Sequence, residues 1–140
     1  MTYSDRAKSI FAEEIEELRK LSASIDKNFD KAVELIYACK GKLVVMGIGK
    51  TGIIGHKIAS SLASTGTSAI FVNAAEAVHG DLGMVCSKDV VLLVSNSGAT
   101  NEILNVIAPL RNLGCTLIAM TGDPDSQLAQ ESDVVISVHV

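Results

Sequence analysis

The chain has 140 residues, enough for one compact domain, and 48% of them are apolar while only 4% are aromatic. Its formal net charge is −4 and its Lys and Arg residues are scattered, which excludes the basic stripe of a nucleic-acid-binding protein. The apolar runs are too short to span a bilayer and the charged N-terminus does not resemble a signal peptide, so we expect no membrane partner and a cytoplasmic location.

Two amphipathic helices are predicted at the start of the chain. Over residues 3–22 the apolar side chains recur on one stripe of a helix, and they are Tyr3, Ala7, Ile10, Phe11, Ile15, Leu18 and Leu21. A second helix is expected over about 28–39, and Gly41 is expected to end it. We therefore predict a single domain over residues 1–140, with N-terminal helices in 3–40 and a sheet core in 42–140.

Beyond residue 42 the hydrophobic period changes to that of buried strands. Five short apolar runs follow one another, at 43–46, 69–72, 90–94, 116–120 and 134–138. They are separated by helical stretches over 53–64, 100–113 and about 126–131, and by a short helix or ordered loop over 74–81. This alternation predicts an α/β fold with a doubly wound, five-stranded parallel sheet in the order 2-1-3-4-5. In that topology ligands bind beyond the carboxyl ends of strands 1 and 3.

The loop after the first predicted strand has the pattern G-x-G-x-x-G, from Gly47 to Gly52. It lacks the acid that a dinucleotide fold places at the end of strand 2, and Val44 stands where a P-loop needs its first glycine. Lys50, between Gly49 and Thr51, still indicates an anionic or carbonyl-bearing ligand. The alternative is a tight turn that carries a solvated lysine.

The loop after the third predicted strand gathers hydroxyls ahead of a helix. Its members are Ser95, Asn96, Ser97, Gly98, Ala99 and Thr100. Hydroxyls and free N–H groups at a helix N-terminus suit a phosphate monoester, and Gly98 lets the backbone approach it closely. The alternative is ordinary helix capping by Ser97 or Thr100, which needs one hydroxyl rather than three.

Two further residues are candidates for proton transfer. Glu102 lies in the first turn of the predicted helix, where it either complements the helix dipole or acts as a base near the phosphate. His79 lies in a glycine-flanked loop after strand 2 and is either structural or a proton shuttle. The segment 121–126 is a candidate third wall of the site, whereas His56 is expected on the surface and His139 has no evident partner.

Three cysteines, Cys39, Cys86 and Cys115, lie far apart in the chain and are odd in number. Their spacing matches neither a metal site nor a disulfide framework. We expect all three to be reduced thiols in the core, and we expect no metal site.

Four segments together resemble the sugar isomerase (SIS) family and, within it, the arabinose 5-phosphate isomerases. They are VMGIGKTG at 45–52, ASTGT at 63–67, EAVHGDLGM at 76–84 and SNSG at 95–98. The resemblance runs from about residue 30 to the end, and the N-terminal helices are similar only in pattern. One departure is Ala99, where many relatives carry Glu or Gln.

The resemblance implies an aldose–ketose isomerase that interconverts D-arabinose 5-phosphate and D-ribulose 5-phosphate through an enediol, a step toward the Kdo of bacterial lipopolysaccharide. It implies no cofactor. Lys50, His79 and Glu102 match the family's active site, with Glu102 as base, Lys50 as the oxyanion or carbonyl partner and His79 as ring-opening or proton-shuttling group. Ser95, Ser97 and Thr100 match its phosphate loop, and a homo-oligomer, a tetramer built of dimers, is implied.

The chain stops at Val140, whereas relatives continue into C-terminal helices with another glutamate and histidine, and many add a pair of CBS domains. These segments are expected to be absent from this chain. The alternative function is therefore a non-catalytic SIS domain that binds and reports a sugar phosphate. A weaker alternative is a different isomerase of the same fold, such as one acting on hexulose 6-phosphate.

Overall fold

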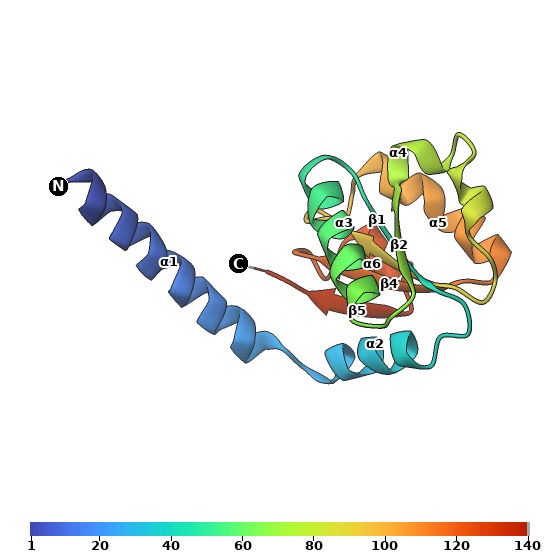
Figure 1. The fold of residues 1–140 in the computed structure, drawn as a ribbon, viewed down its shortest axis with the longest axis horizontal. Coiled ribbons are helices and arrows are strands. Elements are labelled where there is room, and N and C mark those ends of the chain that lie inside the picture. The colour runs from blue at the N-terminus through green and yellow to red at the C-terminus, as the bar shows by residue number, and fades with distance from the viewer. Residues whose placement is uncertain (140) are drawn as a thin grey trace.

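Residues 1–139 of the computed structural model are described, and they form one five-stranded sheet in which all strands run parallel (Figure 1). The strand order is β2-β1-β3-β4-β5, which confirms the predicted doubly wound topology. The strands are β1 (Leu43–Gly47), β2 (Ala69–Asn73), β3 (Val90–Val94), β4 (Thr116–Thr121) and β5 (Val134–Ser137). Each begins at its predicted residue and ends within one residue of the predicted end.

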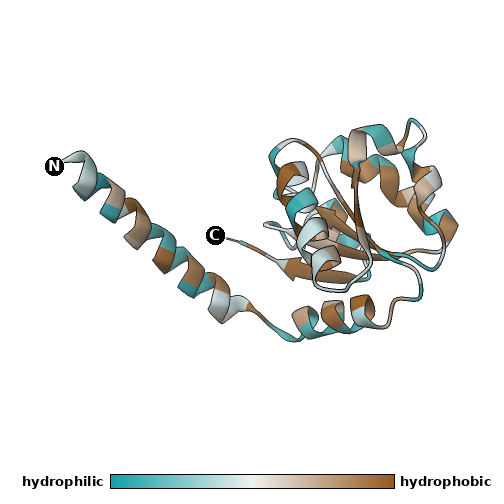
Figure 2. Cartoon of the chain, viewed as in Figure 1, coloured by the Kyte–Doolittle hydropathy of each residue, from teal (hydrophilic) through white to brown (hydrophobic). Residues whose placement is uncertain are grey.

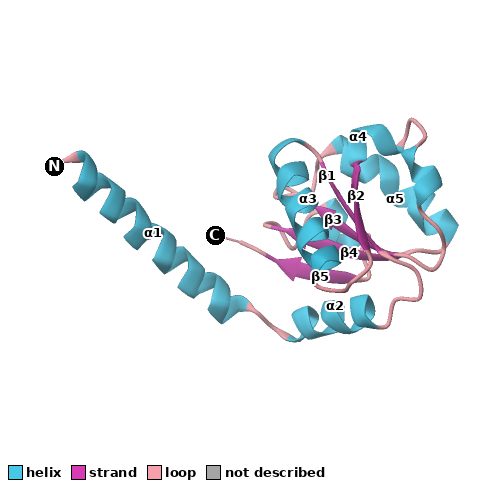
Figure 3. Ribbon diagram, in the orientation of Figure 1, coloured by secondary structure: helices cyan, strands magenta, loops and turns pink. Residues whose placement is uncertain are grey.

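Helices precede and connect these strands (Figure 3). They are α1 (Tyr3–Ser24), α2 (Lys27–Tyr37), α3 (Gly49–Ser64), α4 (Ala74–Ala77), the 3₁₀ turn η1 (Asp81–Met84), α5 (Asn101–Leu113) and α6 (Gln127–Gln130). The prediction that Gly41 ends the second helix is wrong, because that helix is closed earlier, where the N–H of Ala38 donates to the carbonyl of Glu34.

Helix α3 begins four residues earlier than predicted. The Thr51 hydroxyl lies 2.9 Å from the Ile48 carbonyl and accepts from the Ile48 N–H at 3.3 Å, which closes the first helical turn. Gly49, Lys50 and Thr51 therefore belong to the start of a helix rather than to an open loop. Lys50 is thereby placed on a regular element at the carboxyl edge of the sheet.

The core lies on both faces of the sheet because successive strand residues point to opposite sides. On one face Met46, Leu93 and Leu117 pack with α4, α5 and α6. On the other face Val45 and Ile118 pack with α2 and α3. Both faces are covered, which explains why β1 and β3 are buried at every position.

At the amino edge of the sheet, a buried carboxylate joins two segments, the one that precedes β1 and the turn that precedes β3. The side chain of Asp89 is fully buried and accepts hydrogen bonds from the backbone N–H groups of Lys42 (2.9 Å) and Cys86 (2.9 Å), and the Nζ of Lys42 lies 2.7 Å away. Burial opposes the charge of Asp89, but these hydrogen bonds together hold its pKa below the ordinary value.

The expectation of three core cysteines holds only for Cys115, which is buried and whose pKa is raised by that burial. Cys39 is half-buried, and Cys86 is exposed. Cys86 lies in the turn that leads to Asp89, and its backbone N–H donates to that carboxylate while the residue stays exposed. The sequence offers no apolar periodicity there that would have shown this.

Helix α1 stands away from the rest of the molecule (Figure 1). All 22 of its residues are described and none is buried. A capping box begins it, since the Thr2 side chain accepts from the Asp5 N–H while the Asp5 carboxylate accepts from the Thr2 N–H. Over residues 1–139, no helix combines the length and apolar character needed to cross a membrane.

Candidate functional site at the carboxyl edge of the sheet

Three of the predicted site segments leave neighbouring strands at the same edge of the sheet. Gly47 at the end of β1 is in register with Asn73 of β2, and Met46 is in register with Leu93 of β3. The start of α3 therefore lies between the segment that follows β2 and the loop that follows β3. This arrangement brings Lys50, the turn carrying His79 and the loop 95–100 to one end of the molecule.

The loop after β3 is organised by one buried hydroxyl. Ser95 is 2% exposed, and its Oγ accepts a hydrogen bond from the N–H of Gly98 at 3.1 Å. The same Oγ lies 2.9 Å from Oγ1 of Thr100. Ser95 and Thr100 thus bind each other across the loop and hold its two ends together.

Gly98 allows the turn after β4 to pack against this loop. Its φ is +61°, and a Cβ at this position would overlap the side chains of Ser126 and Thr121. The carbonyl of Gly98 accepts from the N–H of Leu128 at 3.1 Å. A glycine is therefore required both for the backbone conformation and for the close approach of α6.

The segment 121–126 does lie against the loop, as predicted for a third wall. The carbonyl of Asn96 accepts from the N–H of Gly122 at 2.9 Å and from the Thr121 hydroxyl at 3.2 Å. Ser126 caps α6 by accepting from the N–H of Ala129. The loops after β3 and β4 therefore form one rigid unit.

The start of α5 is left without a side-chain cap. Thr100 is its N-cap residue, yet within residues 1–139 its hydroxyl makes no cap hydrogen bond, because Oγ1 is turned toward Ser95. The Ser97 hydroxyl accepts from the N–H of Ala99 at 3.2 Å, ahead of the helix. The capping alternative is therefore wrong for Thr100. The N–H of Ile103 donates to the carbonyl of Thr100 at 3.1 Å, whereas within residues 1–139 no side chain accepts from the N–H of Asn101 or Glu102, at the positive dipole end of this 13-residue helix.

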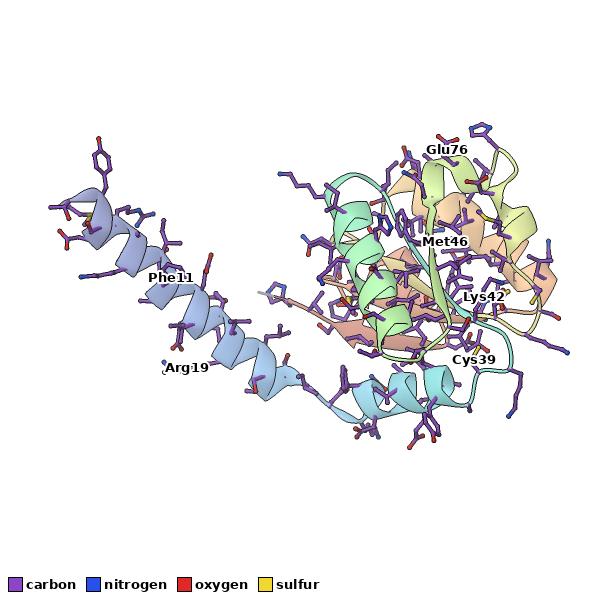
Figure 4. All side chains as sticks on the ribbon, viewed as in Figure 1. Phe11, Arg19, Cys39, Lys42, Met46 and Glu76 are labelled. Carbon is purple, nitrogen blue, oxygen red and sulfur yellow. The ribbon has the colours of Figure 1, made fainter. Side chains whose placement is uncertain are left out.

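The three candidate catalytic residues, Lys50, His79 and Glu102, are all exposed. Lys50 is the second residue of α3, and Glu102 is the second residue of α5. His79 follows α4, in a turn where its N–H donates to the carbonyl of Glu76 at 2.9 Å. Figure 4 labels Glu76 on α4, which packs against α5. The turn of His79 and the helix of Glu102 are thus neighbours.

Sequence reasoning missed two contacts, each made by a histidine. His139 lies beyond the end of β5, and its Nδ1 is 3.2 Å from the carbonyl of Gly122. His56 is exposed as expected, but its ring also stacks on Phe71 at 5.5 Å. No local pattern signals either contact, because the partners are 17 and 15 residues away in the chain. Among the described residues, no group of three or more His, Cys, Asp or Glu is arranged to hold a metal ion.

The model of the SIS domain matches residues 35–140 of this chain. The chain belongs to the SIS domain family. That match covers the sheet with its loops 47–52 and 95–100 and leaves out α1. The resemblance inferred from the four sequence segments is thereby confirmed.

Curated relatives of this SIS domain are named arabinose 5-phosphate isomerase KdsD. The protein of Shigella flexneri is 47% identical over 138 residues, 99% of this chain and 42% of its own length. That of Pseudomonas aeruginosa is 52% identical over 120 residues, 86% of this chain and 37% of its own length. The chain thus spans about two fifths of the length of these relatives.

A solved structure of an Escherichia coli CFT073 protein in complex with a sugar phosphate is also similar. It is 41% identical, and the match covers 100% of this chain and 76% of that protein, with a TM-score of 0.88. The sheet, its order and its covering helices are therefore those of an SIS domain that has been solved with a small sugar derivative bound.

Proposed function

We propose that this SIS domain is a cytoplasmic sugar-phosphate isomerase that interconverts D-arabinose 5-phosphate and D-ribulose 5-phosphate. The observation that carries the proposal is the start of α5, which has no side-chain cap because the hydroxyl of its N-cap residue Thr100 contacts Ser95 instead. A phosphate monoester needs several N–H and O–H donors in one place. The similarity to arabinose 5-phosphate isomerases supports the choice of sugar.

In this proposal the phosphate binds at the loop after β3. The first-turn N–H groups of α5 and the exposed Ser97 hydroxyl donate to its oxygens, with Asn96 and Gly98 shaping the backbone around it. The buried Ser95 and the Thr100 side chain act mainly by keeping the loop in place. Lys50, Gly49 and Thr51 at the start of α3 form the opposite side of the site.

The proposed chemistry moves one proton between adjacent carbons. The carboxylate of Glu102 removes the proton from C2 of the open-chain aldose, and the electron pair of that C–H bond forms the enediolate. The ammonium of Lys50 stabilises the developing oxyanion. His79 opens the sugar ring and carries a proton between O2 and O1, and Glu102 returns its proton to C1, which yields the ketose.

The experiment is to incubate the protein with arabinose 5-phosphate and to follow the formation of ribulose 5-phosphate. We expect turnover by the wild-type chain and a loss of roughly 1000-fold in Glu102→Gln, with sugar-phosphate binding retained. Glu131→Gln, at the far end of α6, is the matched control and keeps full turnover. Tight binding without turnover in the wild type contradicts the isomerase and supports a domain that only senses the sugar phosphate.

We also propose that the active form is a homo-oligomer, a dimer or a tetramer built of dimers. The proposed site is open to solvent, because Lys50, His79 and Glu102 are all exposed in the single chain. Proton transfer through an enediolate benefits from exclusion of water. A second copy that covers the carboxyl edge would supply that exclusion.

A further inference from the structure

Two cysteines that are 29 positions apart in the chain meet at the amino edge of the sheet. The Sγ of Cys115 lies 3.3 Å from the carbonyl oxygen of Cys86. Their neighbours are close as well, since a Cβ on Gly114 would lie 3.9 Å from the Cβ of Ser87. The loop that leads into β3 passes beside the C-terminal end of α5 (Figure 1). The turn before β3 and the turn after α5 are therefore packed against each other at these two cysteines.

The two sulfur atoms are within reach of a covalent bond. Given its distance from the carbonyl oxygen, the Sγ of Cys115 lies within about 6 Å of the Cα of Cys86, by standard bond lengths. Disulfides join cysteines whose Cα atoms lie about 4.4–6.8 Å apart. Cys115 is held in place, because its N–H donates to the carbonyl of Leu110 at 3.1 Å. A rotation of the Cys86 side chain, with a small movement of its exposed turn, would bring the two sulfur atoms together.

The two thiols differ in their surroundings. The strands are strongly hydrophobic (Figure 2), and Cys115, which directly precedes β4, is only 3% exposed in the core that they form. Burial raises the pKa of the Cys115 thiol, and the nearby Asp89 and Cys86 raise it further. Cys86, in contrast, is exposed. An oxidant from solvent therefore reaches Cys86 before it reaches Cys115.

The third cysteine belongs to the other face of the sheet. Cys39 packs with the apolar residues under α2 and α3, whereas Cys115 belongs to the core under α4 and α5. The Sγ of Cys39 lies 3.5 Å from the carbonyl of Lys42 and 3.4 Å from that of Lys88. Figure 4 labels Cys39 and Lys42 at this edge. Because the sheet lies between Cys39 and Cys115, Cys39 is an internal control for the other pair.

From these contacts we propose that Cys86 and Cys115 form a peroxide-sensitive redox site, in which oxidation joins them in a reversible disulfide. Hydrogen peroxide transfers one oxygen atom to the Cys86 sulfur, so that its O–O bond breaks, a sulfenic acid forms and water leaves. The Cys115 sulfur then attacks the Cys86 sulfur. The S–S bond forms, the S–O bond breaks, and the hydroxyl group leaves as water with the proton of Cys115. Two electrons pass from the thiols to the peroxide, and a dithiol reductant reverses the reaction.

This disulfide fastens the end of the segment that carries His79. Cys86 lies two residues beyond η1, which ends at Met84 and closes that segment. The bond encloses β3 and α5 in a loop of roughly 30 residues, and a cross-link of this span stabilises a fold that it fits. In a reducing compartment such bonds are transient and serve redox sensing. The site lies at the edge opposite the proposed sugar-phosphate site and does not depend on it.

The test treats the full chain with hydrogen peroxide and counts its free thiols. We expect the count to fall from three to one, with the loss of two hydrogen atoms in mass and full recovery in dithiothreitol. Trypsin places the three cysteines in separate peptides, so mass spectrometry should find residues 58–88 joined to residues 112–140. The melting temperature of the oxidised chain should rise by roughly 5 °C or more.

Two serine variants make the comparison specific. Cys86→Ser, at an exposed position that keeps the fold, should abolish the link, and Cys39→Ser should leave it intact. Urea unfolding of the reduced variants confirms that both are folded. Three remaining thiols, a link that includes Cys39, a covalent dimer, or a sulfinic acid at Cys86 without a link would overturn the inference. A lower melting temperature of the oxidised chain would overturn it as well, because the bond would then not fit the folded structure.

Discussion

The hydroxyl of Ser95 and the hydroxyl of Thr100 lie 2.9 Å apart, across the loop that joins β3 to α5. This contact turns the N-cap residue of α5 away from its own helix. Threonine ordinarily caps the start of a helix, but Thr100 does not cap α5. The uncapped start of α5 lies at the carboxyl edge of the sheet, where α/β proteins bind their ligands. The loop is thereby shaped by a side-chain pair and not by capping.

The first prediction separates the serine that shapes this loop from the serine that is free to bind. Ser95→Ala leaves the Gly98 N–H and the Thr100 hydroxyl without their shared partner, so we expect a loss of about 1–3 kcal/mol in the free energy of unfolding. Ser97→Ala removes an exposed hydroxyl and should change the unfolding free energy by less than about 0.5 kcal/mol. It should nevertheless weaken the binding of arabinose 5-phosphate.

Urea unfolding and calorimetric titration measure these two quantities. Equal loss of stability in the two variants would contradict the assignment of Ser95 as the structural member. Unchanged sugar-phosphate affinity in Ser97→Ala would contradict its place in the proposed phosphate site.

The second prediction concerns two glycines with nearly the same positive φ. Gly98 has φ +61° and faces Ser126 and Thr121, whereas Gly49 has φ +58° and has open space where a Cβ would stand. Gly49→Ala should cost about 1–2 kcal/mol for the left-handed conformation alone. Gly98→Ala should cost clearly more, about 3 kcal/mol or above, because the added methyl group overlaps side chains of the next loop.

Chemical denaturation of both variants gives the two costs directly. If Gly98→Ala were no more destabilised than Gly49→Ala, the contact between the loops after β3 and β4 would not be as close as the structure has it.

The third prediction is a pH dependence that arises from Asp89. Burial opposes the charge of its carboxyl, yet hydrogen bonds from Lys42 and Cys86 hold the pKa below the unfolded value. The carboxylate therefore stabilises the fold fully above about pH 4, and this contribution is lost as the pH falls through the lowered folded-state pKa. Asp89→Asn should lower the unfolding free energy at pH 7 by about 2–4 kcal/mol and flatten its decline in acid.

Urea unfolding at a series of pH values between neutrality and strong acid tests this. Asp125→Asn, at an exposed position, is the control and should leave both the stability and its acid dependence as in the wild type. If the stability of Asp89→Asn falls in acid as steeply as that of the wild type, a group other than Asp89 is responsible for the pH dependence.

The fourth prediction distinguishes two lysines of the same helix. Lys50 lies in the first turn of α3 at the proposed site, and Lys57 lies two turns further along. In the proposed reaction Lys50→Met removes the cation that stabilises the enediolate, so kcat/KM for arabinose 5-phosphate should fall at least about 100-fold. Lys57→Met should leave it unchanged. A comparable loss of kcat/KM in both variants would contradict a specific contact between Lys50 and the enediolate, and would indicate a general effect of positive charge on α3.

Much of the fold could be predicted from the chain because its strands are buried on both faces. A run such as Val90–Val94 is apolar at every position and bounded by polar residues, so both its existence and its limits were evident. Helix α3 was harder: the glycines at its start suggested a turn, and the Thr51–Ile48 contact that makes it helical leaves no periodic pattern.

Local sequence determined which residues come to the carboxyl edge, since the alternation of strand and helix places Lys50, His79 and the loop 95–100 there whatever the details of packing. Tertiary structure decided the contacts between distant segments. The turn between β4 and α6 requires glycine at position 98, and His139 pairs with Gly122. Tertiary structure also decided that Cys86 is exposed. The physical reason is one of range. Periodicity and turn chemistry act between residues a few positions apart, whereas a close approach of two loops depends on how whole elements pack.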